Sequence, residues 1–282
     1  MDAASQTLEL AQDVARHSMQ RLVGRHGLAA TLYNADCLDV LPLACDAVVT
    51  DPPYGTTACK WDDALDLPAL WERLKASVKT RGAVVMTASQ PFTAALVMSN
   101  LDWFKYCWVW EKSKASNFLW ADYMPLKAHE DVVVFSDGQV AYAANGQRMA
   151  YYAQKERGEP YNKGVEKRQR GPSVFSGGWS ESGAVKLVNE SGDRNPRSVI
   201  YFRTAESEGN LHPTQKPVAL MAYLVATYAQ PGETVLDPYM GSGTTGIAAL
   251  RKGCNFIGIE RDAAHFKTAR DRIAHELEGA LL

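Results

Sequence analysis

The chain has 282 residues, of which 46% are hydrophobic and 22% are charged, and these ordinary values exclude the disordered, collagen-like and coiled-coil classes. Its 30 Lys and Arg against 32 Asp and Glu give a formal charge of -2, which excludes a uniformly basic nucleic-acid coat but permits a local basic patch. The five cysteines form no metal-type cluster and no apolar run approaches the ~18 residues of a membrane span, so we expect a soluble, cytoplasmic protein without a metal.

Apolar spacing divides most of the chain into short elements. Residues 5–23 carry apolar side chains at helical spacing and predict one amphipathic helix. Buried-type strands are predicted at 31–36, 47–51, 82–89, 106–111, 131–136, 234–237 and 256–260. Helices are predicted at 244–251 and 262–277. This alternation is typical of βαβ units and predicts an α/β fold whose parallel sheet is covered by helices on both faces.

The pattern breaks between residues 138 and 203. This segment has few periodic apolar positions and many scattered aromatic residues. It holds 11 Lys and Arg against 6 Asp and Glu, a local charge of +5 that leaves about -7 for the rest of the chain. Such an insert is either a solvated loop of a kind common on enzymes or a region that contacts a polyanion.

A glycine-rich turn connects a predicted strand to a predicted helix at residues 235–246. Gly241 and Gly243 allow a tight turn close to a ligand, and the two threonines that follow can cap the helix. Glu260 ends the next strand, 23 positions after Asp237, where a carboxylate can accept hydrogen bonds from both hydroxyls of a ribose. Together these features predict a site for a nucleotide-type cofactor, either a dinucleotide or an adenosyl compound.

The tetrapeptide Asp51-Pro52-Pro53-Tyr54 directly follows another buried-type strand. Each proline fixes its φ and lacks an N–H, so the Asp51 carboxylate and the Pro52 carbonyl are rigid acceptors for the two hydrogens of one exocyclic amino group. Accepting them localises the lone pair of the nitrogen for attack on an electrophile, and the Tyr54 ring offers a surface on which a base can stack. A turn that merely caps the strand is the structural alternative.

Taken together, these segments resemble the amino-group DNA methyltransferases that use S-adenosylmethionine, in the β arrangement of their motifs. The tetrapeptide matches the catalytic motif of that family. Residues 237–245 match its cofactor motif, although Tyr239-Met240 stands where Phe-Cys is common. Residues 32–38 are similar to the strand whose acid contacts the adenine side of the cofactor, and residues 212–217 to the segment before the cofactor motif.

The resemblance implies a Rossmann-like fold with a mostly parallel seven-stranded sheet in the order 3-2-1-4-5-7-6 and a circularly permuted order of motifs. The strands before Asp51 and Asp237 would then be neighbours, so that the catalytic and cofactor loops meet although 186 positions separate the two residues. The implied domains are a catalytic half of the methyltransferase domain at 1–137, a target-recognition insert at 138–209 and a cofactor-binding half of the same domain at 210–282.

The resemblance also assigns site residues. The catalytic residues are Asp51, Pro52, Pro53 and Tyr54, and no metal is required. The cofactor-binding residues are Asp36, Cys37, Asp51, His212, Thr214, Lys216, Asp237, Tyr239, Gly241, Ser242, Gly243, Thr244, Thr245, Glu260 and Arg261. For His212 and Lys216, a role in anchoring the loop fits equally well.

The implied activity is site-specific methyl transfer from S-adenosylmethionine to the N6 amine of an adenine in a flipped-out nucleotide. Asp at the head of the tetrapeptide favours adenine, and an N4-cytosine enzyme is the alternative. A nicotinamide-dependent dehydrogenase would explain the glycine-rich turn and Glu260 but would leave the tetrapeptide without a purpose. A catalytically silent DNA-binding regulator would not need the cofactor site.

The implied partner is double-stranded DNA, contacted through residues 138–203. Family analogy further suggests a homodimer. Whether a cognate restriction nuclease exists stays open, as does the recognition sequence.

Overall fold

The computed structural model of the chain describes residues 18–24, 27–55, 65–140, 146–167, 184–208 and 215–279. The chain forms two compact units, the first made of Met1–Tyr152 with Ser198–Leu282 and the second of Ala153–Arg197.

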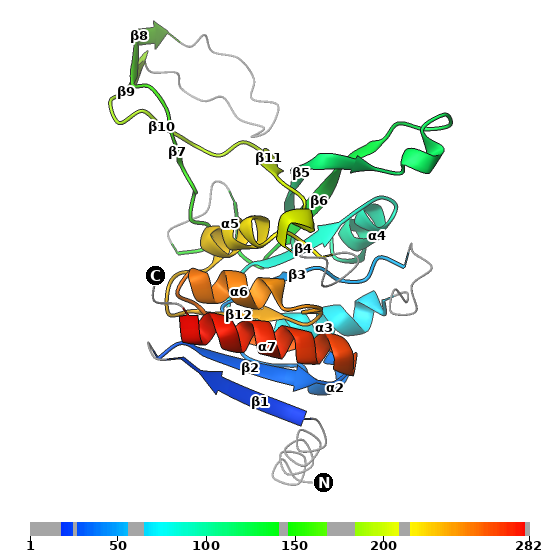
Figure 1. Cartoon of the computed structure of the whole chain (residues 1–282). Coiled ribbons are helices and arrows are strands. Elements are labelled where there is room, and N and C mark those ends of the chain that lie inside the picture. The colour runs from blue at the N-terminus through cyan, green and yellow to red at the C-terminus, as the bar shows by residue number, and fades with distance from the viewer. Residues whose placement is uncertain are drawn as a thin grey trace. The chain divides into compact units, whose positions relative to one another are not determined.

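The first unit is built on a nine-stranded sheet, whereas seven strands were predicted (Figure 1). In spatial order the strands are β1 (Ser18–Val23), β2 (Ala29–Asn34), β13 (Asn255–Ile259), β12 (Thr234–Asp237), β3 (Ala47–Thr50), β4 (Val84–Ala88), β6 (Lys127–Phe135), β5 (Phe104–Ser116) and β11 (Val199–Phe202). Neighbours run parallel except in the pairs β1–β2, β4–β6 and β5–β6. The predicted α/β class with a mostly parallel sheet is confirmed.

The helix predicted at 5–23 is wrong over its last six residues. These form the edge strand β1, which pairs antiparallel with β2 from Ser18 opposite Asn34 to Val23 opposite Ala29. Within β1 only Gln20 and Leu22 are partly buried, a period of two, and Leu22 packs against the core of the sheet. A short apolar pattern does not distinguish this period from that of a helix, and the free edge of β2 supplies the hydrogen bonds. Residues 5–17 lie outside the described part of the chain.

Helices cover both faces of the sheet. One face packs against α2 (Cys37–Val40), α3 (Leu67–Ser77) and α4 (Phe92–Ser99), and the other against α5 (Val218–Tyr228), α6 (Thr244–Arg251) and α7 (Ala263–Gly279). Helix α6 has the predicted bounds, and α7 lies within three residues of its predicted bounds.

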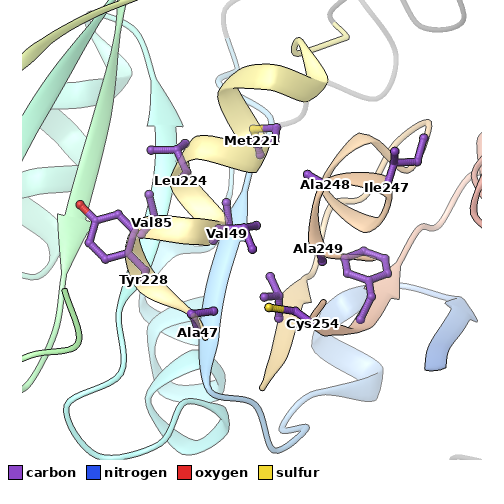
Figure 2. Close-up of a cluster of buried hydrophobic side chains, with 14 of the residues drawn as sticks. Ala47, Val49, Val85, Met221, Leu224, Tyr228, Ile247, Ala248, Ala249 and Cys254 are labelled. Atoms are coloured by element: carbon purple, nitrogen blue, oxygen red, sulfur yellow. The ribbon is translucent and has the colours of Figure 1, made fainter. Parts of the chain in front are cut away.

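The central strands are buried on both faces because their alternate side chains reach both layers. Val48 belongs to the hydrophobic cluster that contains the buried residues of α3, whereas Val49 belongs to the cluster that contains those of α5. Figure 2 shows Met221, Leu224 and Tyr228 of α5 beside Val49 and the neighbouring strand. This packing fixes the ends of β3 and β12, from which the site is built.

Strands β5 and β6 extend beyond their neighbours as a two-stranded ribbon (Figure 1). Strand β4 pairs with β6 only from Asp131 to Phe135, and β11 pairs with β5 only from Val109 to Lys112. Among the described strands, none therefore pairs with the ribbon over residues 113–130. Its end carries the short 3-10 helix η1 (Phe118–Trp120).

The second unit holds two small antiparallel sheets, one made of β7 (Glu156–Arg157) and β10 (Asp193–Arg194), the other of β8 (Tyr161–Lys167) and β9 (Ala184–Asn189). Its bounds fall inside the insert predicted at 138–209. Within that predicted insert, Met149 and Ile200 instead pack in the core of the first unit.

Over the residues that the structure describes, no helix has both the length and the apolar composition needed to cross a membrane.

Candidate functional site

The glycine-rich turn and the tetrapeptide share one cavity of about 1150 Å³ in the first unit. The reason is that β12 and β3 are paired neighbours, with Val235 opposite Ala47 and Leu236 opposite Val48. The loops that follow these two parallel strands therefore open at the same edge of the sheet, where α/β proteins bind their ligands.

The cavity wall contains most of the predicted site residues. All four predicted catalytic residues line it, as do the predicted cofactor residues Asp36, Cys37, Asp51, Lys216, Asp237, Tyr239, Gly241, Ser242, Thr244, Thr245, Glu260 and Arg261. Gly243 is not part of the wall; it is the N-cap of α6 with a φ of 82°, and an added Cβ would crowd Ala269. His212 and Thr214 lie outside the described residues.

Both oxygens of the Asp51 carboxylate are held by side-chain donors. The Tyr54 hydroxyl donates to Oδ1 at 2.9 Å, and the Thr87 hydroxyl at the end of β4 donates to the same oxygen. Lys216 Nζ donates to Oδ2 at 2.8 Å. The Tyr54 ring in turn stacks on Phe92, with the ring centroids 5.3 Å apart. The carboxylate is thus fixed in direction. Oδ1 already accepts from two hydroxyls, whereas Oδ2, with Lys216 as its one side-chain donor among the described residues, keeps lone-pair capacity for a ligand.

Lys216 lies between two carboxylates in a largely buried position. Its side chain is 8% exposed, and Nζ is 3.5 Å from Glu130 Oε2 as well as in contact with Asp51. Burial by itself would lower the pKa of Lys216, but the negative charges of Asp51 and Glu130 raise it well above its usual value. Lys216 is therefore a permanent cation at neutral pH.

Glu130 completes this charge network from β6. Its Oε1 is 3.3 Å from Lys112 Nζ, on the neighbouring strand β5. Burial would raise the pKa of Glu130, but Lys216 and Lys112 hold it below its usual value. The network of two cations and two carboxylates balances its own charge, as buried charges must.

Thr87, Glu130, Lys112 and Phe92 are site residues that the sequence predictions missed. Thr87 offered a signal, since a polar side chain near the end of a buried strand points to the ligand edge of a parallel sheet. Glu130 and Lys112 lie beyond the apolar cores of their strands and gave no such signal. Their place depends on the antiparallel pairing of β5 with β6, which brings them to the same edge.

Asp237 links the two loops directly. The Thr50 hydroxyl, at the end of β3, donates to Asp237 Oδ1 at 2.6 Å, and the Tyr239 N–H donates to the same oxygen at 3.0 Å. The side chain is 2% exposed. Burial raises the pKa of Asp237 to about 6, although hydrogen bonds from Thr50, Thr245 and Tyr239 oppose that shift.

We expect Asp237→Asn to stabilise the protein at neutral pH. Because the folded-state pKa of about 6 exceeds the ordinary 3.8, the folded form binds the extra proton and loses stability as pH rises from about 4 to about 6. Ionised Asp237 thus costs roughly 3 kcal/mol at pH 7, a cost that asparagine avoids while still accepting from Thr50 and Tyr239.

Urea unfolding at pH 5 and pH 7 measures this effect. The gain should be larger at pH 7 than at pH 5. Asp102→Asn, at an exposed turn, is the matched control and should change the free energy of unfolding by less than about 0.5 kcal/mol. An Asp237→Asn protein that is no more stable than wild type at pH 7 contradicts the assignment.

The glycine-rich turn is held by Glu260 at the end of β13. The Gly241 N–H donates to Glu260 Oε2 at 3.0 Å, and the Asp262 N–H donates to Oε1 at 2.8 Å. Gly241 has a φ of 50°, in the left-handed region that favours glycine. Burial raises the pKa of Glu260, while the two backbone donors lower it. The carboxylate faces the cavity beside the turn, as a ribose-binding residue requires.

Two further polar groups in the cavity wall lack partners. Both amide atoms of Gln215 and the Thr244 hydroxyl are buried without a hydrogen bond from any residue that the structure describes. Buried polar groups are normally satisfied, so such groups at a cavity wall are suited to a polar ligand. With Glu260 and the glycine-rich turn, they fit an adenosyl cofactor that carries an amino-acid end.

Cys37 lines the cavity and is unsuited to reaction. Burial raises the pKa of its thiol to about 11, although a hydrogen bond with Tyr239 lowers it. The thiol is therefore protonated at neutral pH. Among the described residues, no three or more His, Cys, Asp or Glu side chains gather as they would around a metal ion.

Solved DNA methyltransferases have the same fold. The crystal structure of the M1.HpyAVI-SAM complex is 23% identical, covers 86% of this chain and 98% of that chain, and gives a TM-score of 0.58. The cytosine-N4-specific PvuII DNA methyltransferase is 15% identical, covers 88% of this chain and 92% of its own, and gives a TM-score of 0.56. At these identities the likeness defines the class of fold.

The family follows from the sequence comparisons. The chain is 41% identical over 76 residues to the type II methyltransferase M2.DpnII of Streptococcus pneumoniae and 37% identical over 92 residues to M2.LlaDCHI of Lactococcus lactis subsp. cremoris. These alignments span 27% and 31% of this chain and only 28% and 34% of the relatives. The DNA methylase model N6_N4_Mtase matches residues 45–271, and the chain belongs to this family, which confirms the predicted resemblance.

Proposed function

We propose that the protein is a site-specific DNA methyltransferase that moves a methyl group from S-adenosylmethionine to an exocyclic amine of a flipped-out base. The observation that carries this proposal is the pairing of β12 with β3, which brings the amino-group acceptors of the tetrapeptide and the glycine-rich turn to one cavity. The M1.HpyAVI structure of similar fold contains the same cofactor.

The cofactor would lie along the turn. Glu260 would accept the ribose hydroxyls and Asp36, which caps α2, would lie at the adenine side. Gln215 and Thr244 offer unpartnered polar groups to the amino-acid end. When bound, S-adenosylmethionine supplies a methyl group on a positively charged sulfur, which is a strong electrophile. We propose the whole predicted set, His212 and Thr214 included, as cofactor-binding residues.

The tetrapeptide would hold the acceptor base. A base within a duplex does not present its amino group to this cavity, so it has to be extruded. Asp51 and the Pro52 carbonyl would accept the two amino hydrogens, and Tyr54, supported by Phe92, would stack on the ring. The nitrogen lone pair is then directed at the methyl group, and positioning supplies most of the rate enhancement.

Adenine N6 is the proposed acceptor, because the tetrapeptide begins with Asp. Cytosine N4 is the second candidate, since it presents the same amino group and since the PvuII enzyme of similar fold is described as cytosine-N4-specific. A nicotinamide-dependent dehydrogenase would leave the network around Asp51 unexplained, and a silent DNA-binding regulator would not need its fixed carboxylate.

The remaining predictions belong to the same proposal. Residues 138–209 would form the target-recognition insert, whose charge of +5 over 138–203 suits double-stranded DNA. The sheet would be a circularly permuted methyltransferase sheet of order 3-2-1-4-5-7-6, with β12 and β3 as strands 1 and 4. We further propose a cytoplasmic, homodimeric enzyme that acts with or without a restriction nuclease.

Sequencing modified bases in DNA from a methylation-deficient host that expresses the protein tests this proposal. N6-methyladenine at every copy of one short sequence is the expected result, and N4-methylcytosine would establish the second candidate. Unmodified DNA from cells that contain the folded protein would contradict both. The Asp51→Asn variant is the matched control and should leave the DNA unmodified.

A further inference from the structure

The end of the β5–β6 ribbon carries an unusually apolar surface. Phe118 is 74% exposed, Leu119 77% and Tyr123 82%. We call this surface the apolar tip; it consists of the exposed residues Phe118, Leu119, Trp120, Tyr123, Met124 and Leu126. Single exposed apolar residues are common, but a cluster of this kind marks a binding surface.

The apolar tip lies beyond the part of the ribbon that pairs with the rest of the sheet. Within the part of the chain that the structure describes, no strand pairs with the ribbon over residues 113–130. The rings of Trp120 and Tyr123 pack edge to face, with their centroids 6.3 Å apart, so these two aromatic side chains contact each other at the tip. The tip is thus a preformed apolar projection that exposes its side chains to solvent.

The position of the tip relates it to the site. Asn117 and Phe118 line the same cavity as Asp51 and Tyr54. Lys112, Lys114 and Lys127, on the stem of the ribbon, also line this cavity. An apolar end and a lysine-bearing stem therefore border the space that a flipped base would enter.

We propose that the apolar tip is a DNA wedge that fills the place vacated by the flipped base, an inference that rests on the proposed function. Extruding a base leaves an apolar gap between its former neighbours and costs the stacking energy of that step. Side chains inserted between base steps recover part of that energy. A two-stranded ribbon also fits a DNA groove. Phe118 and Leu119, which begin η1, are the proposed wedge residues.

A second copy of the chain is the competing occupant. The position of Phe118 disfavours this occupant. Phe118 lines the cavity, so a protein packed on the tip would cover part of the cavity wall. A DNA duplex has to approach this same wall to deliver its base, so contact with the tip follows from the proposed reaction.

The test compares the double variant Phe118→Ala/Leu119→Ala with wild type on oligonucleotides that carry the sequence found by modified-base sequencing. On the duplex we expect kcat/KM to fall about 10-fold or more, the equivalent of one lost base stack. On the same strand alone, and on a duplex mismatched at the target, we expect little change, because these bases need no wedge. The fluorescence of 2-aminopurine at the target position should report reduced flipping.

Met98→Ala removes another exposed apolar side chain, 67% exposed, from α4 and is the control, with no change expected. Equal loss of activity on all three DNA substrates overturns the wedge, as does a change of oligomeric state by light scattering, which would indicate an interface between copies. Full activity of the double variant on the duplex, or a wild type that acts only on single strands, overturns it too. If wild type modifies no DNA, the proposed function itself fails.

Discussion

Asp51→Ala is expected to lower methyl transfer by about 1000-fold or more. It should spare most of the binding of S-adenosylmethionine, because Asp51 is only one of the many proposed cofactor-binding residues. The carboxylate is the acceptor that would orient the amino group, and it directly precedes Pro52, whose carbonyl is the second proposed acceptor. Incorporation of a labelled methyl group into target DNA measures the first quantity, and calorimetric titration with the cofactor measures the second.

The alanine variant also removes a partner from Lys216, so its folding has to be controlled. Asp51→Asn keeps the shape and one oxygen for Lys216, but it places an NH₂ donor where Oδ1 accepts from Tyr54 and Thr87, and it removes the negative charge that would attract the amino hydrogens of the base. We expect this variant to be folded, to bind the cofactor and to be inactive. Activity in either variant at the wild-type level would show that Asp51 does not hold the acceptor amine.

Lys216→Met is expected to have the largest effect on stability. It removes a buried cation that lies between two partly buried carboxylates and leaves Asp51 and Glu130 to repel each other. Breaking a fully buried ion pair costs about 3–5 kcal/mol, and the loss here should lie near the lower end of that range because the Asp51 side chain is 23% exposed. Urea unfolding at pH 7 measures this loss, and methyl transfer should fall with it because Asp51 loses the donor to its Oδ2.

The pH dependence of this stability difference follows from the directions in which the pKa values of Glu130 and Lys216 are shifted. The lowered pKa of Glu130 contributes stability above its unfolded pKa, which is lost as pH falls through the folded value. The raised pKa of Lys216 contributes stability below its unfolded pKa, which is lost as pH rises through the folded value. The difference between wild type and Lys216→Met should therefore be greatest between about pH 5 and pH 10.

A double variant separates charge from packing. Lys216→Met/Glu130→Gln removes one carboxylate together with the cation, so it should recover part of the lost stability while methyl transfer stays low. A double variant no more stable than Lys216→Met would mean that the lysine acts through packing of its chain rather than through charge.

The sequence was sufficient for the centre of the sheet. Residues 47–50 and 234–237 are short, mainly apolar runs that are largely buried. Such runs are typical of the central strands of a parallel sheet, which is covered on both faces. Their position before the tetrapeptide and the glycine-rich turn also predicted most of the cavity wall. Local pattern and ligand chemistry agree at these positions.

The periphery was not predictable in the same way. The strands predicted at 106–111 and 131–136 extend to Phe104–Ser116 and Lys127–Phe135, because cross-strand pairing continues where the apolar pattern has ended. The contact of Lys216 with Asp51 joins residues 165 positions apart, and only the assembled sheet brings them together. Edge strand β1 likewise depends on a partner strand rather than on its own pattern.

The sheet order has a consequence for the newly made chain. Strands β12 and β13, at residues 234–259, fill the middle of the sheet between β2 and β3, which are made some 200 residues earlier. Until those residues leave the ribosome, β2 and β3 each have an unpaired edge where β13 and β12 will later add. Unpaired apolar strands are prone to mispairing and to binding by chaperones. Folding and site assembly should thus finish together, so that an incomplete chain has neither half of the site ready.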